Sequence, residues 1–176
     1  MAFQAVTGRA LRNFRVRFQR IGILLLLPAP VIFGQTLRLS SASASPGARI
    51  SIDISLHSLP GKQPSTLQWE ITIPSDRLSF AEDSVSVGPM AQKSGKTVNC
   101  AAKGAKTATE RTLVCILYGG VDPIPDGVVA QIHFQVPANG TPGSVTVRLD
   151  EGLAVFVDLK KIALGPAKTS IRIFAK

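Results

Sequence analysis

The chain has 176 residues, of which 45% are hydrophobic and 18% charged, and its formal net charge is +9. This composition is sufficient for one packed domain and excludes a disordered or fibrous chain. Five of the 20 basic residues lie in the first 20 positions, whereas the part from Gln35 onward holds 15 basic and 11 acidic residues. The excess charge is concentrated at the N-terminus, so the composition gives no reason to expect a nucleic-acid partner.

Residues 1–34 have the pattern of a secretory signal. An apolar run at 21–33 is too short to span a bilayer comfortably. We predict export, with cleavage after Gly34 and a folded domain at 35–176. The alternative is an uncleaved N-terminal anchor, which would be the protein's membrane contact; either way the domain is periplasmic, on the cell surface or extracellular. The basic residues that precede the apolar run are Arg9, Arg12, Arg15, Arg17 and Arg20.

Alternating apolar and polar residues predict strands through the rest of the chain. The clearest case is 49–57, where Ile50, Ile52 and Ile54 alternate with polar residues. Turns rich in Pro, Gly and Asp separate the segments, a pattern typical of an all-β sandwich or jelly roll. A helical turn is expected at 75–78. Further strands are expected at 67–73, 111–118, 129–136, 144–149, 161–164 and 169–174.

Segment 92–111 consists mostly of small, polar and basic residues. It contains Cys100 and ends shortly before Cys115, and an exported chain meets an oxidising compartment. We predict a hairpin insertion pinned by a disulfide between these cysteines; the alternative is two buried thiols. The cations either keep a sheet edge soluble or bind an anionic polymer, lipid headgroups or an acidic partner. They are Lys93, Lys96, Lys103, Lys106 and Arg111.

No set of residues predicts catalysis. His57 and His133 fall on the polar faces of their strands, and no Gly-x-Ser-x-Gly nucleophile motif is present. The carboxylate pairs at 82–83 and 150–151 are adjacent in sequence, and adjacent strand residues point to opposite faces. The sequence therefore indicates a protein without enzymatic activity and predicts no cofactor.

A bound calcium ion is the one metal that the sequence leaves open. Asp122 and Asp126 flank a Pro-Ile-Pro turn, and loop carboxylates of extracellular modules often bind this ion. The segment lacks the density of carboxylates of an EF-hand loop. The sequence therefore predicts no metal site and keeps calcium as the alternative.

The order of these signals resembles the cohesin family. The matching stretches are 37–39, 45–56, 67–78, 126–136, 142–149 and 169–173. The resemblance implies an antiparallel jelly-roll sandwich of about nine strands that binds a small calcium-dependent protein domain, the dockerin, across one sheet face. The usual Tyr-Asp pair of the family is replaced here by Ile73 and Pro74.

Two binding functions follow from this resemblance. The first is a protein-binding module that uses polar residues of one sheet face, and the resemblance implies a link to polysaccharide breakdown. The second is a carbohydrate-binding module, for which an exposed row of Trp69, Tyr118 and Phe156 would supply stacking; Trp69 is assigned to the core on its strand pattern. The residues expected on the protein-binding face are Ser51, Asp53, Ser55, Gln131, His133 and Gln135.

Overall fold

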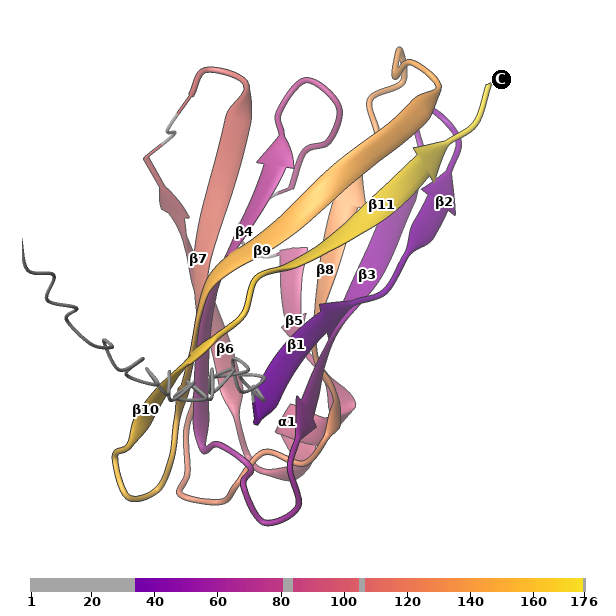
Figure 1. The fold of residues 1–176 in the computed structure, drawn as a ribbon. Coiled ribbons are helices and arrows are strands. Elements are labelled where there is room, and N and C mark those ends of the chain that lie inside the picture. The colour runs from indigo at the N-terminus through magenta and orange to yellow at the C-terminus, as the bar shows by residue number, and fades with distance from the viewer. Residues whose placement is uncertain (1–33, 81–83, 105–106, 176) are drawn as a thin grey trace, which may run out of the picture. The chain divides into compact units, whose positions relative to one another are not determined.

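The computed structural model describes residues 34–80, 84–104 and 107–175, which form two facing β-sheets (Figure 1). The predicted signal lies outside the described residues, apart from Gly34. No helix of the described part is both long and apolar enough to cross a membrane. The elements are β1 (Gln35–Leu39), β2 (Ala42–Ala44), β3 (Arg49–Ser58), β4 (Thr66–Pro74), β5 (Val85–Val87), α1 (Pro89–Lys93), β6 (Thr97–Lys103), β7 (Glu110–Tyr118), β8 (Gly127–Gln135), β9 (Gly143–Val155), β10 (Lys161–Leu164) and β11 (Ala167–Ile173).

The smaller sheet has four strands in the order β1-β3-β8-β5. The larger sheet has the order β2-β11-β9-β4-β7-β6, and β10 pairs with β9 at its side. The predicted all-β sandwich is confirmed. One pairing differs from the antiparallel prediction: β2 and β11 run parallel, with Ala42 opposite Ile171. The structure also has more strands than the nine expected. Short strands such as β2 and β5 were not predicted because they have too few residues to show an alternating pattern in the sequence.

Period-two burial builds the core between the sheets. Ile52 and Ile132 face each other across the β3–β8 pair, and both are fully buried. Trp69 and Phe134 are the largest fully buried side chains, so the assignment of Trp69 to the core is confirmed. Because alternate residues of each strand turn toward the facing sheet, one continuous apolar cluster forms between the two layers.

The short helix α1 was not predicted. Pro89 lies in its first turn, where the missing N–H leaves no helical hydrogen bond unmade. Gly88 precedes it and lies directly against β8, since an added Cβ atom would come within 2.6 Å of the Val128 carbonyl oxygen. The helix has only five residues, and a segment this short cannot display a helical period.

Candidate functional site

The polar residues expected on a binding face lie together on the outer side of the smaller sheet. Ser51 is in register with His133, and Asp53 with Gln131. The Ser51 Oγ atom lies 2.6 Å from His133 Nδ1, and the Gln131 amide donates to the Asp53 carboxylate at 2.9 Å. These side chains already satisfy one another, so a partner would gain little by contacting them. Their role in binding stays a prediction.

The other two members of that set lie nearer the margins of the same sheet. Ser55 is opposite Arg38 of the edge strand β1. The Gln135 amide donates to backbone carbonyls, the shortest bond being 2.8 Å to Gly47. Gln135 therefore ties the end of β8 to the turn before β3, which is a structural role independent of any partner.

The histidines and carboxylates are dispersed. His57 is exposed near the end of β3, while the second ring nitrogen of His133 lies 3.5 Å from the Ser86 hydroxyl. Asp150 is 3.8 Å from Arg148, and its neighbour Glu151 is exposed with a positive φ of 49°. The pair at 82–83 lies outside the described residues. Within the described chain, no group of three or more His, Cys, Asp or Glu side chains is arranged to hold a metal ion.

The loop carboxylates proposed for calcium lie between β7 and β8. Asp126 accepts a hydrogen bond from the backbone N–H of Ser58 at 3.0 Å, and Asp122 is exposed. The Asp126 carboxylate thereby joins this loop to the end of β3. The prediction that no metal is bound, with calcium as its alternative, stays untested.

The aromatic residues proposed for carbohydrate stacking do not form a row. Trp69 is 0% exposed, Phe156 packs against the core, and Tyr118 is 42% exposed at the end of β7. Sugar recognition on sandwiches relies on exposed ring faces, and only one of these three rings offers a substantial one. The described geometry therefore gives no support to the carbohydrate alternative.

The cations of segment 92–111 do not form one exposed patch, contrary to the expectation of a basic loop. Lys93 and Arg111 are exposed, whereas Lys96 is only 5% exposed. The Lys103 ammonium forms an ion pair with Glu70 of β4 at 2.5 Å. The pattern in sequence could not show this, because the residues that bond these lysines come from other strands and loops. Lys106 lies outside the described residues.

Lys96 instead acts as a structural cation. Its Nζ donates to the carbonyl oxygens of Gly119 at 2.5 Å and Gly120 at 3.2 Å, which fixes the turn after β7. Burial lowers the pKa of Lys96 below its ordinary value, and the nearby Asp122 carboxylate opposes this in part. The folded protein therefore releases this proton at a lower pH than the unfolded chain does.

A pH experiment tests the burial of Lys96. At pH values between the lowered pKa of folded Lys96 and the ordinary lysine pKa, the unfolded chain binds more protons than the folded protein does. In this pH range the contribution of Lys96 to the free energy of unfolding therefore rises with pH. We expect a Lys96→Met variant to lack that rise in urea unfolding measured from neutral to alkaline pH. Lys93→Met, at an exposed site, is the control and should retain it. Parallel curves for the wild type and Lys96→Met would contradict the assignment.

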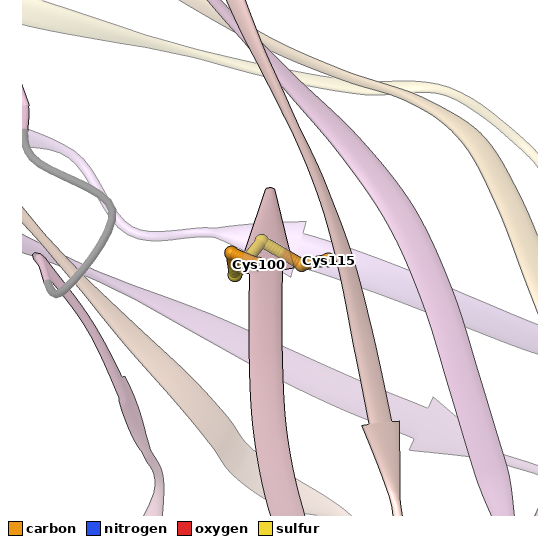
Figure 2. Close-up of a disulfide and its surroundings, with 2 residues drawn as sticks. All are labelled: Cys100 and Cys115. Atoms are coloured by element: carbon orange, nitrogen blue, oxygen red, sulfur yellow. A yellow bond between two sulfur atoms is a disulfide. The ribbon is translucent and has the colours of Figure 1, made fainter. Parts of the chain in front are cut away.

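Figure 2 shows the disulfide between Cys100 of β6 and Cys115 of β7. The two cysteines are directly opposite in the β6–β7 register, with Cα atoms 4.1 Å apart. The predicted disulfide and the hairpin that carries it are thus present. Because β6 is an edge strand of the larger sheet, the bond attaches this edge covalently to the interior of the sheet.

Sequence reasoning missed the outer face of the larger sheet, where apolar side chains reach the surface. Leu113, Cys115 and Leu117 of β7 point into the core, so the intervening Val114 and Ile116 point outward. Ile116 is 39% exposed. A shallow hollow of about 260 Å³ surrounds it, lined by Gln68, Asn99, Cys100, Ala101, Val114, Cys115 and Ile116. The signal was present in the sequence as the continuous apolar run at 113–118.

Charged pairs border this apolar centre. Lys103 of β6 pairs with Glu70 of β4 across the intervening strand β7, and Arg148 of β9 pairs with Glu110 of β7 across β4 at 2.7 Å. Leu153 of β9 lies opposite Gln68 and extends the apolar surface past β4. We call this surface, made of Gln68, Asn99, Ala101, Val114, Ile116 and Leu153, the β7 face. An apolar centre with a polar margin is the usual anatomy of a protein interface.

The two sheets and their order define a cohesin-like sandwich. Neither a model of a protein family nor a curated protein sequence matches this chain. Solved structures do match, and they include a non-cellulosomal cohesin from the hyperthermophilic archaeon Archaeoglobus fulgidus, with 15% identity, a TM-score of 0.64, and coverage of 80% of this chain and 91% of that one. A type I cohesin–dockerin complex from Clostridium thermocellum matches with 17% identity, a TM-score of 0.63, and coverage of 80% and 99%.

A third structure has the same fold. It is the sixth cohesin of scaffoldin B from Acetivibrio cellulolyticus, solved in complex with a dockerin, with 14% identity, a TM-score of 0.62, and coverage of 80% and 99%. These likenesses span nearly the whole length of the cohesin modules. At such low identity they establish the cohesin-like fold that the order of strands predicted.

Proposed function

We propose that this protein is a non-catalytic, exported module that binds a protein partner of dockerin type through the β7 face. The proposal rests chiefly on the exposed apolar centre of that face, where Ile116 and Val114 occupy positions that a solvated sheet would fill with polar residues. Solved neighbours of this fold are complexes with dockerins, which supports the class of partner.

The contrast between the two outer faces supports the choice of surface. On the smaller sheet, Ser51, Asp53, Gln131 and His133 are paired with one another. The β7 face instead presents apolar surface beside Asn99 and the partly exposed Gln68. Burial of apolar area drives most protein association, so the β7 face has more free energy to gain from a partner.

Export and a role in polysaccharide breakdown are parts of the same proposal. The disulfide between Cys100 and Cys115 suits an oxidising compartment, and the sequence before Gly34 has the pattern of a secretory signal. Any link to polysaccharide would come through the bound partner, because the aromatic row that direct sugar binding would use does not form.

An affinity experiment tests the proposal. Exported proteins of the source cells are passed over the immobilised full chain in calcium and eluted with a chelator. We expect a stoichiometric partner to bind the wild type and to be lost from Ile116→Asp, because a carboxylate buried at an apolar contact weakens binding by about 2–4 kcal/mol, or roughly 30- to 1,000-fold.

Thr146→Asp is the matched control, since Thr146 is also an exposed strand residue on the outer side of the larger sheet but lies outside the β7 face. It should retain the partner. Absence of any stoichiometric partner, or equal retention by Ile116→Asp and the control, would contradict the proposal.

A further inference from the structure

Exposed apolar side chains are concentrated at one end of the sandwich. Among the described residues, the large hydrophobic side chains that are exposed include Ile116 on the β7 face and Phe174 after β11. One of the others is the last residue of β7. The rest belong to the loops that join β3 to β4, β7 to β8 and β9 to β10, and these loops lie at the same end of the sandwich, at the bottom of Figure 1. They are Leu59 at 47%, Tyr118 at 42%, Val121 at 75%, Val157 at 59% and Leu159 at 79% exposed.

Hydrogen bonds hold the three loops together as one surface. The Ser65 N–H, just before β4, donates to the Val155 carbonyl at the end of β9 at 2.8 Å. The Ile124 N–H of the β7–β8 loop donates to the Pro64 carbonyl at 2.8 Å. We call this surface, with its residues Leu59, Tyr118, Val121, Val157 and Leu159, the apolar tip.

Leu159 shows that the apolar character of the tip is maintained against a conformational cost. Its φ is 63°, in the left-handed region that Gly and Asn occupy far more readily than Leu. The N–H of Leu159 closes the turn by donating to the Phe156 carbonyl at 2.9 Å. A glycine or asparagine would make the same turn with less strain, so the leucine side chain is best explained by a contact it makes outside the domain.

The chain enters the domain at the same end. The Leu59 N–H donates to the Gly34 carbonyl at 3.0 Å, so the first described residue is attached to the tip. The sequence just before it, at 21–33, is the apolar run that either directs export or stays in the membrane as an anchor. The covalent connection to this run therefore leaves the domain at the end that carries the apolar tip.

We propose that the apolar tip inserts shallowly into the surface of a lipid bilayer and orients the domain on it. The three loops carry Lys62 and Lys160 together with Asp122, Asp126 and Asp158, so the attraction comes from apolar side chains that enter the lipid and not from net charge. Tyr118 suits this position because its ring is apolar while its hydroxyl prefers the headgroup region. The β7 face is a separate set of residues, so this proposal stands or falls independently of partner binding.

Fluorescence quenching tests the insertion. The full chain carrying Val157→Trp is reconstituted into phosphatidylethanolamine–phosphatidylglycerol vesicles with brominated acyl chains. Phe174→Trp is the matched control, because Phe174 after β11 is 49% exposed against 59% for Val157, and the native Trp69 is buried. We expect the added tryptophan at position 157 to emit at shorter wavelength and to be quenched about twofold more than the one at position 174.

A second variant separates insertion from folding. Leu159→Asn, placed in the Val157→Trp protein, should reduce the quenching while keeping or raising the resistance to urea, because asparagine tolerates the positive φ. Equal quenching at positions 157 and 174 would overturn the proposal. It would also be overturned if the shorter-wavelength emission at 157 appeared without lipid and grew with protein concentration, since that result would assign the tip to contact between copies of the chain.

Discussion

Replacing Trp69 with alanine is expected to lower the free energy of unfolding by about 3–5 kcal/mol, the largest effect of any single substitution considered for this chain. Trp69 is fully buried on β4, which lies between β7 and β9 at the centre of the larger sheet. The substitution removes an indole ring from the middle of the core, and strands held on both sides cannot collapse into the space. Urea unfolding followed by far-ultraviolet circular dichroism measures the loss.

Trp69→Phe is the informative control. It keeps an aromatic ring and removes the indole N–H, which is buried with no hydrogen-bond partner among the described residues. The expected loss is therefore smaller than for alanine, because part of the lost packing is offset by removal of an unsatisfied donor. Equal losses for the two variants would show that ring packing at Trp69 contributes little to stability.

Removing the disulfide is expected to have the second largest effect. The bond closes a loop with a sequence separation of 15, and in the chain-entropy model a loop of that length stabilises a fold by about 3 kcal/mol. A Cys100→Ala, Cys115→Ala double variant should therefore unfold at lower urea concentration than the oxidised wild type. The reduced wild type should resemble the double variant, and matching stability of the oxidised wild type and the variant would contradict the expectation.

The sequence carried enough information to predict the sandwich. In β3, apolar residues at every second position, such as Ile52 and Ile54, leave only one way to bury them, and the same holds for Phe134 in β8. Strand neighbours were harder to infer, because pairing depends on partners distant in sequence. The bulge between β3 and β8 illustrates the limit: Val129 and Ala130 are both fully buried, which simple alternation does not predict.

The candidate site was predicted less well than the fold, for a physical reason. Outward residues of a polar strand are easy to recognise, and these proved to be the mutually bonded set around Ser51 and His133. On β7 both faces are apolar, so Val114 and Ile116 could not be distinguished from core residues before their orientation was known. Lys96 shows the same limitation, since its burial depends on carbonyls more than twenty residues away in sequence.

The parallel pairing of β2 with β11 has a consequence for how the protein reaches its native state. These strands come from opposite ends of the described chain, and Ser43 finds its neighbour Arg172 only when nearly all of the polypeptide is present. A contact between residues so distant in sequence forms late and slowly. During synthesis, β2 must wait for the last strand to emerge, so truncation before Ala167 should yield an aggregation-prone chain with β9 left uncovered.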